Sequence, residues 1–282
     1  RWTIAARFEV APDQLIFTSG ATESVHLALL GSAPNHAPGR IVLSGVEHPA
    51  VLAAADQLKS KGWTVAFWPV DELGLIRLEV LDELLEAPTR MVSLIAAQSE
   101  VGALQPIAEV GQACRARGIT FHTDATQLIP QGCPEFQGFH SDLVSLSAHK
   151  FQGPRGIGLL IRDSSLPLAP VQGGGGQEFG VRSGTEAIPL IAGMAQALSV
   201  LPAYQLGGDS IPPGSGPGVR QQRDDLLQAL LNIPGLSLLG PNVDQRSPNH
   251  IAVLVGSADG QPISARAMVR ELALRGVACS SG

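Results

Sequence analysis

The sequence predicts an α/β fold in which a mostly parallel β-sheet is covered by helices on both faces. Short apolar runs alternate along the chain with segments whose apolar residues recur at helical spacing, and this alternation favours parallel strands joined by crossover helices. A chain of 282 residues, 44% hydrophobic and 16% charged, has the length and composition of a globular protein with a large core.

The strands of the main sheet are expected at the short apolar runs. These runs are residues 15–19, 40–45, 64–70, 90–98, 119–125, 141–149 and 156–163. Helical periodicity predicts helices at residues 22–33, 48–62, 77–87, 106–118 and 188–201. Functional side chains of such sheets gather at the carboxyl ends of the strands, so the polar residues that end these runs are the candidates for a site.

A smaller α+β domain is expected at the C-terminal end of the chain. The segment 206–218 is rich in glycine, proline and serine and predicts a linker between a large domain, 1–205, and a small domain, 219–282. The small domain is expected to contain helices at 219–235 and 263–276 and strands at 250–256 and 277–281. Because the chain opens on a helix-like segment without an initiator methionine and stops at a turn-like one, both domains are expected to be truncated.

Charge and composition argue against several classes of protein. The net charge is -6 and the basic residues are scattered, which argues against a nucleic-acid surface. No apolar run approaches the ~18 residues of a membrane span. The three cysteines, Cys114, Cys133 and Cys279, provide no disulfide framework and indicate a reducing compartment. A cytoplasmic protein without a metal site is therefore expected.

Lys150 is one of only three lysines in a chain with sixteen arginines, and it follows the apolar run 143–148. A sheltered lysine can lose its proton and become an amine nucleophile, whereas an arginine stays charged. Lys59 and Lys61 need no explanation beyond a positive charge at the end of a helix. The alternative for Lys150 is a surface lysine on a turn, so the functional interpretation requires its amine to be sheltered.

Two stretches are suited to bind a phosphate. An apolar strand leads into a helix that starts near Ala21 and Thr22, where free N–H groups and the helix dipole attract an anion. Thr22 could instead only cap that helix. Ser147 and His149 are two residues apart on an extended backbone, so both side chains can face one anion while Lys150 points elsewhere.

Asp124 and His48 end two further predicted strands. A carboxylate at Asp124 could pair with the N–H of a protonated heteroaromatic ring, or cap a helix. His48, between Glu47 and Pro49, could stack on a flat ring and move protons, or cap a turn. Together with the phosphate-binding residues and Lys150, these groups describe pyridoxal phosphate held as a lysine Schiff base.

The glycine-rich segment 173–185 lacks the spacing that follows a strand in dinucleotide-binding loops, so the sequence does not support a dinucleotide site there. Arg182, Ser183 and Thr185 in this segment could still donate hydrogen bonds to a phosphate, including one in a neighbouring subunit.

Several motifs, in this order, make the sequence similar to the NifS/IscS-type cysteine desulfurases, which are class V aminotransferase-fold, fold-type I pyridoxal-phosphate enzymes. The motifs are FTSGATES, EHPAVL, VGALQPI, FHTDATQ, SLSAHKFQGPRGIG, RSGT and SSG. The resemblance implies that Lys150 carries the cofactor, that Asp124 binds its pyridine nitrogen and that His48 stacks on its ring and serves in acid–base steps. It also implies that Gln127 hydrogen-bonds to the phenolic oxygen. The residues implied to hold the phosphate are Thr22, Ser147, His149 and, across a homodimer interface, Thr185.

The sequence departs from the family pattern at two places. Ser99 stands where the family has the second residue of Asn-Asn-Glu, and its shorter reach toward the phenolic oxygen is expected to tune the cofactor. The chain stops at Gly282, whereas the resemblance places the nucleophilic cysteine and the arginine for the substrate carboxylate beyond that residue. Cys279, Cys114 and Cys133 are not expected to replace that cysteine.

The resemblance implies a desulfurase that converts L-cysteine to alanine and takes up the sulfur as a persulfide on a loop cysteine. An iron–sulfur scaffold or a thiolation pathway would then receive the sulfur. Two alternatives stay open: a C–S or C–Se lyase of the same fold, acting on cysteine, cystine or selenocysteine, and a catalytically weakened homologue that serves as a scaffold. Ser99 and the absence of the nucleophilic cysteine motivate the second alternative.

Overall fold

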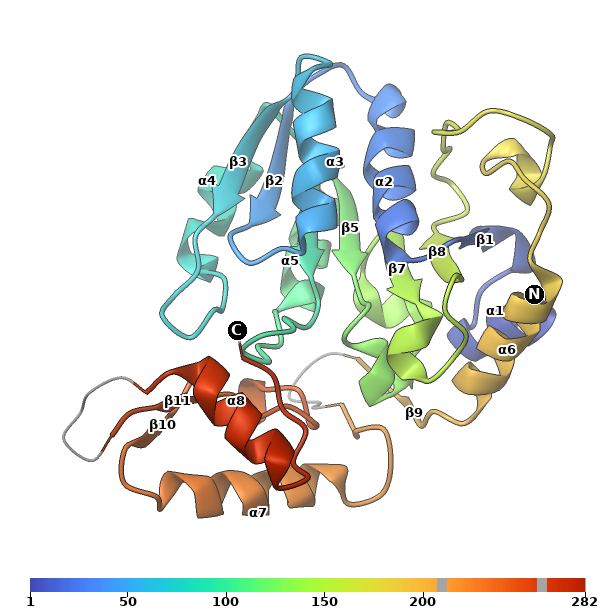
Figure 1. Ribbon diagram of the computed structural model, residues 1–282. Helices are drawn as coiled ribbons and strands as arrows, with labels where there is room; N and C mark the ends of the chain where they lie inside the picture. The colour runs from blue at the N-terminus through green and yellow to red at the C-terminus, as the bar shows by residue number, and fades with distance from the viewer. Residues whose placement is uncertain (207–211, 258–262, 282) are drawn as a thin grey trace.

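The computed structural model describes residues 1–206, 212–257 and 263–281, and a mixed sheet of seven strands forms its centre (Figure 1). From one edge to the other the strands are β1 (Leu15–Thr18), β8 (Gly158–Arg162), β7 (Leu143–Ser147), β5 (Thr120–Asp124), β4 (Thr89–Ile95), β2 (Arg40–Ser44) and β3 (Thr64–Trp68). Strands β7, β5, β4, β2 and β3 are parallel, and β8 runs antiparallel to both of its neighbours. The predicted mostly parallel sheet is confirmed.

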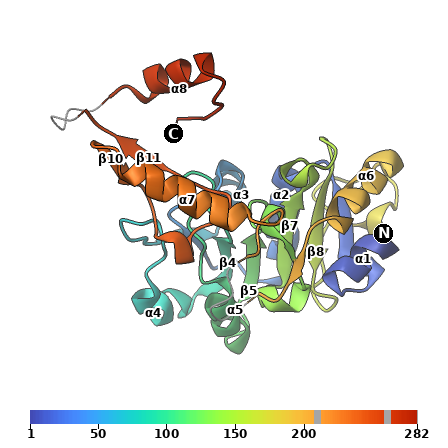
Figure 2. The same ribbon diagram turned by 90° about the horizontal axis from the view of Figure 1, so that it is seen from below.

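The strands are continuously apolar because both faces of the sheet are covered. Along β2, Ile41 and Leu43 point to one face, where they pack with side chains of α2 (Ala21–Ser32) and α3 (Pro49–Lys59). Val42 points to the other face. The helices that cover that face include α1 (Trp2–Phe8), α5 (Ile107–Ala116) and α6 (Ile188–Ser199). Figure 2 shows α2 and α3 on the side of the sheet opposite α5, so the prediction of helices on both faces is confirmed.

The C-terminal part of the chain lies beyond the carboxyl ends of the parallel strands (Figure 1). It contains α7 (Val219–Leu231), the antiparallel pair β10 (Leu236–Leu238) and β11 (Val253–Val255), and α8 (Ala265–Leu274). Ser247 N–H donates to the Gly102 carbonyl at 2.8 Å, and Leu104 N–H donates to the Gln245 carbonyl at 2.9 Å. These bonds attach the segment to the loop after β4. The division of the chain into two domains stays a prediction, and residues 207–211 of the expected linker lie outside the described residues.

Two predicted elements are wrong in extent. The helix expected at 77–87 is reduced to a 3-10 turn, Leu78–Val80, and the short helix α4 (Leu81–Leu85), which ends ahead of Pro88 because a proline disfavours helical conformation in the residue before it. The strand expected at 277–281 is not formed. Its residues are exposed, and no strand of the described part pairs with them. A further short parallel pair, β6 (Cys133–Pro134) with β9 (Ala203–Tyr204), was not predicted.

Candidate active site

A cavity of about 680 Å³ opens at the carboxyl ends of the parallel strands, the edge at which the sequence places the functional residues. It is lined by the starts of α2 and α3 and by residues that follow β4, β5 and β7. The structure brings nine of the ten predicted site residues to this cavity: Ala21, Thr22, His48, Ser99, Asp124, Gln127, Ser147, His149 and Lys150. Thr185 is exposed and does not line it.

The turn from β1 to α2 forms one wall of the cavity. Helix α2 begins at Ala21 after Gly20, and no side chain caps its first N–H groups, so Thr22 is not the cap. The turn lies against β8: a Cβ on Gly158 would come within 2.5 Å of the Gly20 backbone. A glycine at 158 is therefore required for this close approach, and the uncapped helix start faces the cavity ready for an anion.

Ser147 and His149 lie at the end of β7, beside the start of α2. The Ser147 Oγ and the His149 Nδ1 are 2.9 Å apart, so the two side chains lie on the same side of the backbone. Partial burial, followed by the positive charges of Lys150 and Arg155, lowers the pKa of His149. The imidazole is thus more readily neutral than usual, while the surrounding cations still attract an anion.

Lys150 lies in the 3-10 turn Ala148–Phe151 that follows the buried strand β7. It lines the cavity and interacts electrostatically with the Asp124 carboxyl, but it is exposed rather than sheltered. The expectation of a sheltered amine is therefore wrong, and the functional interpretation of Lys150 rests on its place in the cavity wall and its interaction with Asp124 rather than on burial. The lysine is carried on the turn beyond the end of the strand, where the cavity is open.

Asp124 is the last residue of β5, and only 4% of it is exposed. Its Oδ1 accepts a hydrogen bond from the Thr126 N–H at 2.9 Å. Burial raises the pKa of the carboxyl, while the Thr126 bond and the charges of His48 and Lys150 act in the opposite direction. Among the described residues no ion pair reaches Asp124. A buried carboxylate without its own cation fits the protonated nitrogen of an aromatic ring.

His48 is the N-cap of α3, and its Nδ1 accepts a hydrogen bond from the Ala50 N–H at 3.1 Å. The bond fixes the imidazole at the edge of the cavity, with Pro49 as the first residue of the helix. The capping interpretation is therefore correct. It is compatible with a role toward a ligand, because capping occupies only one of the two ring nitrogens.

Ser99 and Gln127 line the cavity from the loops after β4 and β5. The loop that carries Ser99 is held by the C-terminal segment, because the Ser99 carbonyl lies 3.1 Å from the His250 Nε2. The carboxamide oxygen of Gln98 accepts two N–H groups of the same loop, each at 2.7 Å. The position of Ser99 is thus fixed by contacts on both sides of it in the chain.

The cavity wall also contains residues that the sequence prediction did not name, and Thr126 and Arg155 are two of them with polar side chains. The Thr126 Oγ1 is buried and has no hydrogen-bond partner in the described part of the chain. Thr126 and Arg155 lie inside the sequence motifs that contain Asp124 and Lys150. Their place in these motifs could have indicated that they belong to the site. The glycine-rich loop is attached to the same wall, because Arg182 Nε donates to Glu23 Oε1 at 2.7 Å in the first turn of α2.

No cluster of three or more histidine, cysteine or acidic side chains suited to a metal ion occurs in residues 1–206, 212–257 and 263–281. Over the same residues, no helix has both the length and the hydropathy to cross a membrane.

Comparison with known proteins gives one consistent result. A sequence profile of the family described as Aminotransferase class-V matches residues 1–282. The mitochondrial cysteine desulfurase of Eremothecium gossypii is 36% identical over 290 residues, which cover 100% of this chain and 55% of that protein. The cysteine desulfurase IscS of Colwellia psychrerythraea is 35% identical over 283 residues, which cover 99% of this chain and 66% of that protein.

Among solved structures, one titled NifS-like protein matches with a TM-score of 0.86 at 30% identity, covering 100% of this chain and 74% of that one. The chain thus spans about half the length of the Eremothecium relative, with 55% of it covered.

Proposed function

The chain belongs to the class V aminotransferase family, whose members use pyridoxal phosphate, and on that premise we propose that it is part of a pyridoxal-phosphate-dependent L-cysteine desulfurase. The observation that carries the proposal is the combination of three groups in one cavity. These are the amine of Lys150, the buried carboxyl of Asp124 and the uncapped start of α2 with Ser147 and His149 beside it. Cysteine desulfurases at 36% and 35% identity support the choice of substrate.

The residues present fit the cofactor in their chemistry. In the proposal, the N–H groups of Ala21 and Thr22 hold the phosphate together with Ser147 and His149. Asp124 keeps a proton at the pyridine nitrogen, since a buried carboxylate without an ion pair stabilises a cation beside it. These assignments explain why the walls of the cavity contain both an anion-binding turn and a buried acid.

Three further residues complete the proposed site. Lys150 would supply the amine that holds the cofactor, and the same amine would move the Cα proton of the substrate. His48, at the start of α3, would hold the ring, and Gln127 would donate a hydrogen bond to the phenolic oxygen. Ser99 lies on the loop held by His250 and offers a hydroxyl where the family has an amide. Pyridoxal phosphate, when bound, supplies the electron sink for the charge left at Cα.

The sulfur transfer requires a thiolate that attacks the Sγ of the substrate. The Sγ–Cβ bond breaks, Cβ takes up a proton, alanine leaves, and the attacking cysteine holds the sulfur as a persulfide. Burial raises the pKa of both Cys114 and Cys133 to about 12, so neither thiol is a competent nucleophile. Cys279 is exposed but does not line the cavity. In the proposal, the nucleophile is the loop cysteine that the family resemblance places beyond Gly282.

The proposal extends to the assembly. Thr185 is exposed and outside the cavity of its own chain, which agrees with a role at the phosphate of a partner in a homodimer. The persulfide sulfur would pass to an iron–sulfur scaffold or a thiolation acceptor. The sequence predicts the cytoplasm as the compartment, and the Eremothecium relative is named as a mitochondrial protein.

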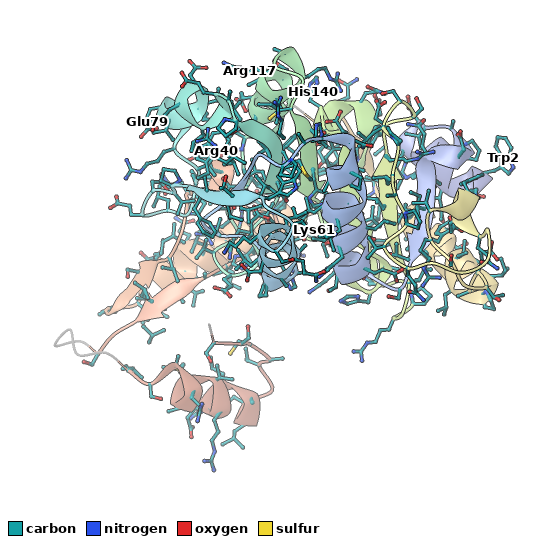
Figure 3. The ribbon with its side chains drawn as sticks, turned by 90° about the horizontal axis from the view of Figure 1, so that it is seen from above. Trp2, Arg40, Lys61, Glu79, Arg117 and His140 are labelled. Carbon is teal, nitrogen blue, oxygen red and sulfur yellow. The ribbon has the colours of Figure 1, made fainter. Side chains whose placement is uncertain are left out.

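The proposal is tested by alanine release from L-cysteine by the full-length protein, compared with Lys150→Ala. Lys61→Ala is the matched control, because Lys61, labelled in Figure 3, is exposed just beyond α3. We expect alanine and a protein persulfide from the wild type and the control, and neither from Lys150→Ala. Free sulfide with pyruvate would instead identify a C–S lyase, and bound cofactor without turnover would identify a scaffold.

A further inference from the structure

Glu47 lies behind the wall of the cavity, in the turn between β2 and α3, directly before His48. Only 8% of this residue is exposed. Its Oε1 accepts hydrogen bonds from the Ser44 hydroxyl and from the Ile95 N–H, the latter at 2.8 Å. One carboxyl oxygen therefore joins the end of β2 to the end of β4, and it fixes the turn from which His48 enters the cavity.

The other oxygen of this carboxyl, Oε2, is buried and has no hydrogen-bond partner in the described part of the chain. No ion pair within the described residues includes Glu47 either. A buried negative charge on an unpartnered oxygen is far more costly than a neutral carboxyl in the same place. Burial raises the pKa of Glu47 to about 8, and the neighbouring Asp124 acts in the same direction.

Asp124 is close to Glu47 because it pairs in register with Ile95, the residue that donates its N–H to Glu47. Among the described residues, Asp124 on β5 is the titratable group that acts on the Glu47 carboxyl, and His48 is the next residue of the same turn. His48 and Lys150 both favour the ionised form of Asp124, whereas no cation in the described part of the chain favours ionised Glu47. Of two neighbouring buried carboxyls, the one that faces cations ionises first.

We propose that Glu47 is a positioning residue that stays protonated at neutral pH. Its neutral carboxyl holds the His48 turn against β4 and leaves Asp124 as the one carboxylate beside the ring nitrogen. This inference deepens the proposed function and rests on it for the ring. The protonation of Glu47 does not depend on the cofactor and can be measured without it.

The first experiment measures the melting temperature of the full-length apoprotein against pH for the wild type and Glu47→Gln. The amide reproduces the shape of a protonated carboxyl and still accepts the bonds from Ser44 and Ile95. The folded protein holds the Glu47 proton up to about pH 8, whereas the unfolded chain releases it near pH 4.5. Wild-type stability is therefore lost as the pH rises through this window, and Glu47→Gln removes that loss.

We expect Glu47→Gln to melt higher than the wild type at pH 8, by roughly 5 °C, and the difference to shrink toward pH 5. Glu178→Gln is the matched control, because Glu178 is also buried but its oxygens bind Arg1 at 2.6 Å and the Phe17 N–H at 3.1 Å. Loss of that charge should lower the melting temperature at neutral pH. A difference that does not grow from pH 5 to pH 8 would show that the folded protein does not hold the Glu47 proton through this window, and it would overturn the proposal.

The second experiment measures pyridoxal phosphate affinity and the visible absorbance of the bound cofactor. Glu47→Ala removes the acceptor of the Ser44 and Ile95 bonds, so it should weaken affinity by about 10-fold, and Glu47→Gln should restore it. Equal loss in both variants contradicts the neutral positioning role. If Glu47→Ala does not fold, the cofactor affinity of Glu47→Gln is compared with that of the wild type. Equal affinity supports the neutral positioning role, and weaker affinity contradicts it. If the wild type binds no cofactor, the proposed function is wrong. The melting temperatures of the apoprotein still test whether Glu47 is protonated.

Discussion

Two groups of residues beside the cavity are built from different chemistry. The anion cradle, which comprises Ala21, Thr22, Ser147 and His149, offers backbone N–H groups, hydroxyls and an imidazole, without an acidic side chain of its own. The acidic pair, Asp124 and Glu47, buries two carboxyls at the ends of β5 and β2.

The first group suits an anion, and the second suits a cation through the Asp124 carboxylate. A ligand with a phosphate and a protonated ring nitrogen is therefore recognised by both groups in only one orientation.

Lys150 belongs to neither group, and its loss is expected to have the largest effect. Lys150→Ala should lower alanine release by about a thousandfold or more, because no other lysine lines the cavity. It should also abolish the visible absorbance of lysine-bound cofactor, while Lys61→Ala retains both. Retained absorbance in Lys150→Ala would show that Lys150 is not the lysine that binds the cofactor. The ligand would then not be held between the two groups as proposed.

The acidic side of the comparison is tested by Asp124→Asn. The amide can still accept the Thr126 N–H but carries no charge, so it does not hold a proton at a ring nitrogen. We expect turnover to fall by about 100-fold, since a buried charge interaction of this kind contributes about 3 kcal/mol. Cofactor affinity should fall much less, because the anion cradle is unchanged. Unchanged turnover would mean that Asp124 is only a turn residue.

The anion cradle is tested by Ser147→Ala and Thr22→Val. Each removes one hydroxyl that the proposal places on the phosphate, so each should weaken pyridoxal phosphate binding by roughly 10-fold. Inorganic phosphate should compete with the cofactor in the wild type and less well in either variant. Ser199→Ala, which alters an exposed serine beyond the cavity, is the control. If both variants bind pyridoxal phosphate as tightly as the control, the anion cradle does not bind the phosphate.

The smallest effect is expected at Ser99. Ser99→Asn restores the side chain that the family resemblance leads us to expect, on a loop already held by Gln98 and His250. We expect a change of a few-fold in turnover and a small shift of the visible absorbance, since a longer donor reaches the phenolic oxygen from the same backbone. A gain of 100-fold or more would support the interpretation that this chain comes from a catalytically weakened homologue.

Much of the fold follows from the sequence because burial on both faces makes the strands continuously apolar. The same pattern places Asp124 and Ser147 at strand ends, where the structure brings them to one cavity. A strand at 277–281 was expected from its residues alone, but a strand also needs a neighbour to pair with, and propensity does not reveal whether one is present.

Other features of the site depend on three-dimensional packing. Glu47 and His48 are adjacent in sequence. Only the hydrogen bonds of the Glu47 carboxyl with Ser44 and Ile95 in the folded protein show that it points inward. Likewise, the exposure of Lys150 follows from the turn after β7 rather than from the apolar run before it. Burial of a polar residue is set by distant segments, so local sequence does not predict it.

The most direct test is to bind pyridoxal phosphate to the full-length protein, reduce it with borohydride so that any lysine–aldehyde bond becomes permanent, and locate the label by peptide mass spectrometry. The label is predicted on Lys150 alone, and Asp124→Asn should leave its position unchanged. A label on Lys59 or Lys61, or none on any lysine, would contradict the account.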